Sequence, residues 1–212
     1  MHPSYHRRAN IVLTELKNYF PHSHTVLEFS TPIELLFAVM LSAQTTDKQV
    51  NVVTRTVFNK YPTLTHYVNA DDALFTEDIR AINYYKTKSK HILATARILD
   101  SKFEGTPPKT LEEMLTLPGV GRKTALVVLG NAYNITEGIA VDTHVQRLSN
   151  VFKLTKHTQP EKIEEDLKKL FPKDEWFHLT NRMIDYGRMY CPARCAHEDC
   201  PIVQILKKNR LY

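Results

Sequence analysis

The stretch from Leu117 to Thr124 (LPGVGRKT) constrains the fold most, because three of the six glycines in the 212-residue chain lie between residues 119 and 130. Gly119 and Gly121 permit backbone angles that other residues avoid, and they leave no Cβ to obstruct a close ligand. The preceding segment, Thr110 to Leu117, is typical of a capped helix, since glutamates follow the threonine and apolar residues recur at helical spacing. The apolar segment that follows predicts a second helix.

Two helices joined by a Gly-x-Gly turn form a hairpin that directs backbone N–H groups and the positive end of a helix dipole outward. This arrangement is typical of an anion site, and a DNA phosphate fits it. Similar turns also join helices that bind no ligand, so the tripeptide alone leaves both interpretations open. Lys123, at the start of the second helix, and the later segment Val141-Asp142-Thr143-His144 favour a functional site.

The sequence LPGVGRKTA followed by IAVDTHV resembles the helix-hairpin-helix and Gly/Pro–Asp signature of the endonuclease III family of bifunctional DNA glycosylases and AP lyases. The resemblance extends from about Ile33 to Cys200. It implies an all-α fold of two lobes, with the helix-hairpin-helix in a central helical domain over residues 27–135. Residues 1–26 and 136–212 would form the second lobe, which carries the cysteine segment. DNA would lie across the cleft, with the hairpin and Asp142 at its mouth.

The residues themselves also indicate an all-α fold, because no convincing alternating strand pattern is present. The best β-branched candidate, Val127-Val128, lies in an apolar segment too long for a typical strand. Helices are expected at residues 5–19, 33–43, 47–59, 91–103, 110–117, 123–133, 143–151, 160–171 and 175–186, with one or two short helices between Leu64 and Ala81.

The resemblance implies that Lys123 is the catalytic nucleophile. Its amine would attack C1′, expel the base and form a Schiff base that promotes β-elimination. The attacking amine must be neutral, and burial together with the positive end of a helix would favour that form. Asp142 would stabilise positive charge on the sugar and exchange protons with Lys123. An aspartate before Thr-His-Val is also a good N-cap for a helix that begins at Thr143, so spacing alone leaves Asp142 open.

DNA contacts are expected at two loops. Gln44 lies in Ser-Ala-Gln-x-Thr-Asp, which matches the family segment whose glutamine fills the gap left by an extruded nucleotide; an ordinary loop amide is the alternative. Asn83-Tyr84 stands where the family usually has glycine followed by an aliphatic residue that wedges between the DNA strands. Tyr84 is therefore expected to be the second residue that fills the gap, and the identity of the wedge residue is open. The remaining expected DNA contacts are Lys86, Lys88, Gly119, Val120, Gly121, Arg122 and His144, although a solvated lysine face and a structural histidine are equally ordinary explanations.

Charge and hydropathy narrow the class of partner. The formal net charge of +5 and the isoelectric point near 9.0 permit a polyanionic partner. No apolar run reaches the length of a membrane span, and the first ten residues (MHPSYHRRAN) lack a secretion signal. We therefore expect a cytoplasmic monomer that binds double-stranded DNA containing damaged bases or abasic sites.

All three cysteines, Cys191, Cys195 and Cys200, lie within ten residues, which suits metal binding or free thiols better than disulfides. The family's pattern Cys-x6-Cys-x2-Cys-x5-Cys holds a [4Fe–4S] cluster. The spacings here are three and four, with no fourth cysteine, so we expect a metal-free segment and no cofactor. A cluster with His197 as the fourth ligand and a zinc site are the less favoured alternatives.

Two other functions remain possible from the sequence. A non-catalytic helix-hairpin-helix protein would only hold DNA, and a monofunctional mismatch glycosylase would remove a base without cleaving the strand. Lys123 together with Asp142 favours the bifunctional enzyme, because a pure DNA-binding protein needs neither residue and monofunctional relatives usually lack the lysine. The preferred lesion is not specified by the sequence.

Overall fold

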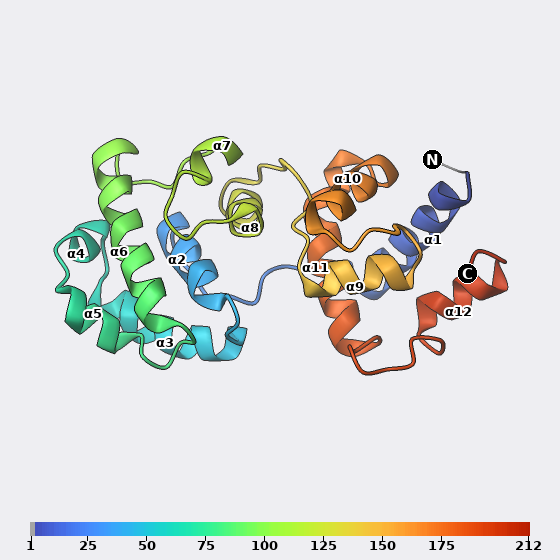
Figure 1. Cartoon of the computed structure of the whole chain (residues 1–212), viewed down its shortest axis with the longest axis horizontal. Helices are drawn as coiled ribbons and strands as arrows, with labels where there is room; N and C mark the ends of the chain where they lie inside the picture. The colour runs from blue at the N-terminus through green and yellow to red at the C-terminus, as the bar shows by residue number, and fades with distance from the viewer. Residues whose placement is uncertain (1–2) are drawn as a thin grey trace. The chain divides into compact units, whose positions relative to one another are not determined.

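The computed structural model describes residues 3–212, and this range contains helices and no strand (Figure 1). The chain divides into two compact units. We call Val26–Ile135 the hairpin unit, and the earlier residues together with Thr136–Tyr212 the terminal unit. In order, the elements are α1 (Pro3–Tyr19), α2 (Pro32–Ser42), α3 (Asp47–Lys60), α4 (Leu64–Val68), α5 (Asp72–Asp78), α6 (Tyr85–Lys102), α7 (Leu111–Met114), α8 (Arg122–Tyr133), α9 (Thr143–Val151), α10 (Pro160–Leu170), a 3-10 turn (Lys173–Glu175), α11 (Trp176–Met189) and α12 (Pro201–Lys208).

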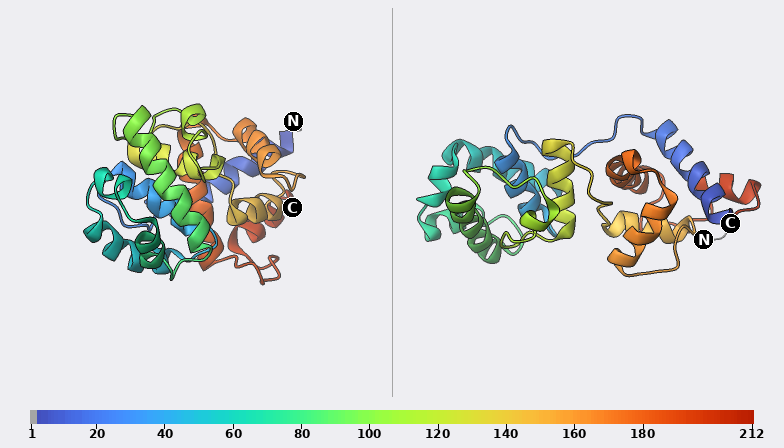
Figure 2. Two further views of the ribbon diagram at one scale, coloured as in Figure 1. Left: turned by 60° about the vertical axis from the view of Figure 1, so that its left-hand side comes forward. Right: turned by 90° about the horizontal axis from the view of Figure 1, so that it is seen from above.

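The hairpin unit is built around α2, whose residues 35–41 are all buried. Thr31 caps this helix by accepting a hydrogen bond from the Glu34 N–H at 3.2 Å, and Pro32 occupies its first position. α2 packs against α3, α6 and α8, while α4 and α5 pack against α6 (Figures 1 and 2). The prediction that α2 lies at the centre of a domain is confirmed.

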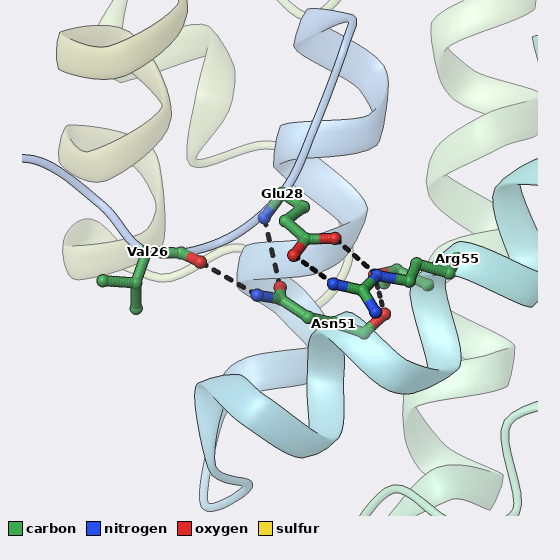
Figure 3. A network of polar contacts seen from close by, with 5 residues as sticks. Val26, Glu28, Asn51 and Arg55 are labelled. Atoms are coloured by element: carbon green, nitrogen blue, oxygen red, sulfur yellow. Dashed lines mark hydrogen bonds and ion pairs between the residues drawn. The ribbon is translucent and has the colours of Figure 1, made fainter.

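The first residues of the hairpin unit, Val26 and Glu28, are held by hydrogen bonds to side chains of α3 (Figure 3). The Asn51 amide donates to the Val26 carbonyl at 2.9 Å and accepts from the Glu28 N–H at 3.1 Å. Arg55 binds the Glu28 carboxylate through Nε and Nη2, at 2.7 and 2.5 Å. These contacts attach the first residues of the unit to α3.

In the terminal unit α1 packs against α11 and α12 (Figure 2). Ala9, Val12 and Leu16 of α1 are buried. The buried carboxylate of Glu175 pairs with both Arg182 and Lys17 in this unit. The helix α12 was not among the expected elements, although its apolar residues recur at helical spacing. No helix among residues 3–212 is both long and apolar enough to cross a membrane.

The expected helix boundaries are wrong in two places. The stretch from Tyr85 to Lys90, expected as a loop, forms the first turns of α6, because Tyr84 adopts a left-handed backbone conformation (φ 59°) and begins the helix. The helix expected at residues 110–117 is only the short α7, which Thr110 caps through the Glu113 N–H at 3.3 Å. The following residues turn toward α8.

Candidate active site

The turn between α7 and α8 is the predicted helix–turn–helix, and its shape depends on Gly119. This residue has φ +75°, and a Cβ built on it would lie 2.5 Å from Nδ1 of His91. The Val120 N–H donates to the Leu117 carbonyl at 3.1 Å, and the Thr95 hydroxyl donates to the Pro118 carbonyl at 3.0 Å. The turn is thus attached to α6. The Val120 side chain is buried and its N–H is used inside the turn, so the DNA contact expected at Val120 stays a prediction that involves neither group.

Gly121 differs from Gly119, because the fold does not require it to be glycine. It has φ −90°, and nothing lies within 4 Å of a Cβ built on it. It is the N-cap of α8 and offers no side chain to cap the first turn. A helix start without a capping side chain presents N–H groups and the positive end of the helix dipole, which suits an anion.

Lys123 is the second residue of α8 and its side chain is exposed. The expected burial of Lys123 is therefore wrong: no neighbouring side chain of its own unit covers it. Arg122, one residue earlier, is also exposed, so two basic side chains start the helix that follows the turn.

Asp142 is the N-cap of α9 in the terminal unit. Its Oδ1 accepts hydrogen bonds from the His144 N–H at 2.9 Å and the Val145 N–H at 2.8 Å. The capping role that the sequence left open is therefore confirmed. Both cap bonds end on Oδ1, so the second carboxylate oxygen, Oδ2, takes no part in the cap. One carboxylate can both hold the helix start and present an anionic oxygen.

His144 packs against α11 rather than standing out from the surface. A Cβ built on Gly187 would lie 2.6 Å from Nδ1 of His144, so the absence of a side chain at Gly187 makes room for the imidazole. The ring is half-buried and lies beside Arg147. This geometry favours the structural role for His144 over a DNA contact.

The loops that carry Gln44 and Tyr84 are joined by hydrogen bonds. Gln44 is exposed and has a left-handed backbone (φ 55°), and its carbonyl accepts from the Asn83 side-chain amide. The Asn83 N–H donates to the Thr45 hydroxyl at 3.2 Å. Tyr84 is 65% exposed. The structure thus places the two expected fillers on neighbouring, connected loops of one unit.

Lys88 was expected to contact phosphate, and the structure contradicts this. The residue is 8% exposed, and its Nζ donates to the carbonyls of Leu41 and Ala43 at 2.8 and 2.6 Å. Burial lowers the pKa of Lys88 below its ordinary value. These carbonyls lie at the C-terminal end of α2, where the last carbonyls of a helix have no N–H partner within the helix. The Lys88 ammonium therefore caps the C-terminus of α2. A helix predicted to start at Tyr85 would have indicated that Lys88 is buried, because Lys88 then lies one turn before the buried Ile92. Lys86 and Lys90 are exposed.

Four side chains in the C-terminal segment meet at one point. The Sγ atoms of Cys191, Cys195 and Cys200 and a ring nitrogen of His197 all lie within 4.8 Å of one another. Such a group could bind a metal.

Comparison with known proteins finds relatives that all belong to one family of DNA repair proteins. The family model for HhH-GPD superfamily base excision DNA repair protein matches residues 37–173. Endonuclease III of Synechocystis is 43% identical over 188 residues, covering 89% of this chain and 86% of the relative. Endonuclease III of Bacillus subtilis is 35% identical over 208 residues, covering 96% and 94%, and that of Escherichia coli is 38% identical over 183 residues, covering 86% of each.

Solved structures agree with the sequence relatives. A trapped covalent intermediate of endonuclease III with DNA has a TM-score of 0.90 and 36% identity over the full length of both chains. A thermostable thymine-DNA glycosylase, at 17% identity and a TM-score of 0.78 over 94% of this chain and 98% of that one, shares the fold. The chain therefore belongs to the HhH-GPD superfamily of base excision DNA repair proteins and, within it, to the endonuclease III family of bifunctional DNA glycosylases and AP lyases.

Proposed function

We propose that Lys123 is the nucleophile with which this chain removes a damaged base and cleaves the abasic site that remains. The observation that carries the proposal is the position of Lys123: it is exposed in the first turn of α8, directly after a glycine turn with no capping side chain. A phosphate held at that turn would bring a deoxyribose close to the amine.

The reaction balances with one amine and one carboxylate. Nζ of Lys123 attacks C1′, and the base leaves with the electron pair of the glycosidic bond and takes up a proton. The C1′–O4′ bond of the sugar then breaks, O4′ takes up the proton that the amine loses, and the Schiff base that forms acidifies C2′. Loss of the C2′ proton expels the 3′ phosphate, and hydrolysis of the Schiff base returns the lysine. We assign Asp142 to stabilising positive charge on the sugar and moving the proton, through the oxygen that does not cap α9.

The damaged nucleotide must leave the base stack before C1′ can be attacked. We propose that Gln44 and Tyr84 fill the space that it leaves, because both are exposed and lie on connected loops. Lys88 acts as a positioning residue for Gln44, since its ammonium holds the end of α2 from which that loop departs. Phosphate contacts are assigned to Lys86, Arg122 and the backbone at Gly119 and Gly121.

The substrate class that we propose is oxidised pyrimidines together with abasic sites. A monofunctional mismatch glycosylase would need no amine at this position, so an exposed lysine in the first turn of α8 favours the bifunctional reaction.

Borohydride trapping tests the nucleophile. Reduction during reaction with abasic DNA should cross-link the wild type and Lys102→Gln, a control at another exposed lysine of the same unit, but not Lys123→Gln. Circular dichroism checks that all three proteins fold. Cross-linking that survives Lys123→Gln would assign the Schiff base to another residue.

A further inference from the structure

The four metal-ligand side chains of the C-terminal segment do not fit the cluster that the family implies. A [4Fe–4S] cube binds each of its four ligands to a different iron, which places thiolate sulfurs about 6 Å apart. Here all four ligand atoms lie within 4.8 Å of one another. The Sγ of Cys195 is 3.8 Å from that of Cys191 and 3.6 Å from that of Cys200. These separations are well short of those around a cube.

The sequence around this group explains the difference. His197 stands three residues before Cys200, which keeps the x2 spacing of the family motif with histidine in place of cysteine. Six residues after Cys200, where the motif has its last cysteine, the chain has Leu206. That side chain is fully buried in the core of the terminal unit and supplies no ligand. Cys195, which the family pattern lacks, provides the fourth donor atom.

A single tetrahedral ion fits this geometry. Zinc–sulfur bonds of 2.3 Å at tetrahedral angles separate two sulfurs by about 3.8 Å, close to both measured distances. Nδ1 of His197 lies 2.9 Å from the Cys195 sulfur and 3.1 Å from the Cys191 sulfur, so an ion requires the ring to move back by about 0.5 Å. His197 has a left-handed backbone (φ 62°), and its Nδ1 faces the sulfurs of Cys191 and Cys195.

The surroundings also suit an anionic centre. Three thiolates and one divalent cation carry a net charge of −1. Arg147 on α9 lies against the group and donates through Nη2 to the Cys191 carbonyl at 2.7 Å. Its buried Nε has no hydrogen-bond partner among the described residues. A guanidinium group beside a thiolate-rich ion would compensate that charge in the low dielectric of the interior.

We propose that Cys191, Cys195, His197 and Cys200 bind one zinc ion, in place of the family's iron–sulfur cluster. The ion joins the end of α11 to the start of α12, because Cys191 follows α11 and Cys200 is the N-cap of α12. Its role is structural, since the four protein ligands leave no open position for substrate. This proposal replaces the metal-free segment expected from the spacing of the cysteines.

Elemental analysis tests the proposal on the full chain. Protein expressed with both iron and zinc in the medium should contain one zinc per chain, no acid-labile sulfide and no visible colour. Exchange with Co2+ should give the intense visible bands of a tetrahedral, thiolate-rich site. Removal of zinc with a chelator should lower Tm, and added zinc should restore it in a concentration-dependent manner.

Two variants with a matched control separate ligands from bystanders. Cys195→Ser should weaken zinc binding by about a hundredfold or more, because it removes a direct ligand. His197→Cys should retain one zinc, because four ligands remain, and His178→Gln, at an exposed histidine of α11, should behave as wild type. Brown protein with stoichiometric iron and sulfide would overturn the proposal. Metal-free protein after exposure to zinc, with three reactive thiols or a disulfide, would also overturn it.

Discussion

Gly119 and Gly121, two residues apart, should respond in opposite ways to the same added methyl group. At Gly119 the positive φ costs a Cβ about 1–2 kcal/mol. The built Cβ also lies 2.5 Å from Nδ1, 2.8 Å from Cγ and 2.9 Å from Cβ of His91, which adds about 1–3 kcal/mol of overpacking. Gly119→Ala should therefore lower the free energy of unfolding by about 2–5 kcal/mol.

Gly121→Ala should hardly affect folding, because φ is −90° and the methyl group meets nothing within 4 Å. Alanine is a poorer N-cap than glycine, which limits the loss to below about 1 kcal/mol. If a DNA phosphate approaches the start of α8, however, the same methyl group obstructs it. Affinity for a duplex with an abasic-site analogue should then fall at least about tenfold, equivalent to about 1.4 kcal/mol.

Urea denaturation and fluorescence anisotropy measure the two effects. His91→Ala provides the internal control, because it removes the imidazole but leaves Cβ and the positive φ. The double variant with Gly119→Ala should be more stable than the sum of the single effects predicts. Equal stability of the two alanine variants would refute the conformational argument. Unchanged DNA affinity of Gly121→Ala would refute the placement of a phosphate at this turn.

Asp142→Asn should reduce turnover by several orders of magnitude with nearly unchanged Tm and DNA affinity, because asparagine still caps α9 but carries no charge. A variant that melts early but keeps normal activity per folded molecule would show that Asp142 is only a helix cap. Lys88→Met should lower the free energy of unfolding by about 1.5–3 kcal/mol, because it leaves the carbonyls at the end of α2 without their charged donor. It should not change the salt dependence of DNA binding. Arg122→Gln, in contrast, should reduce the slope of log K against log salt by about one unit. Folding lowers the pKa of Lys88, so at pH values just below the ordinary pKa of 10.5 the unfolded chain binds this proton more tightly than the folded chain. The free energy of unfolding of the wild type should therefore rise with pH just below 10.5. The rise should be absent from Lys88→Met.

Local patterns in the sequence predicted most of the helices and the hairpin. The caps at Thr31 and Thr110 and the buried run of α2 follow from residue type and spacing, so they are correct in the structure. The membership in the endonuclease III family, expected from the hairpin motif, is confirmed by the relatives.

Features that depend on the precise start of a helix or on a loop conformation could not be predicted in this way. Lys88 looked like a surface lysine because the left-handed Tyr84 that begins α6 has no sequence signal comparable to glycine. The convergence of three cysteines with His197 depends on two turns, Pro192–Cys195 and His197–Cys200, that spacing alone does not define. The exposure of Lys123 was missed because the apolar residues of α8 suggested burial on every side.

If Gln44 and Tyr84 enter the duplex as proposed, the hydrogen bonds between the Gln44 and Asn83 loops have a consequence for how the protein binds damaged DNA. Thr45 accepts from both the Asn83 N–H and the Lys88 ammonium, at 3.2 and 3.4 Å, so the two loops share one anchor in the free protein. Their conformational entropy is lost when the unit folds and need not be lost at each encounter with DNA. The loops that carry Gln44 and Tyr84 would then enter a duplex together as one preorganised unit. A substitution in either loop would also disturb the insertion of the residue on the other loop.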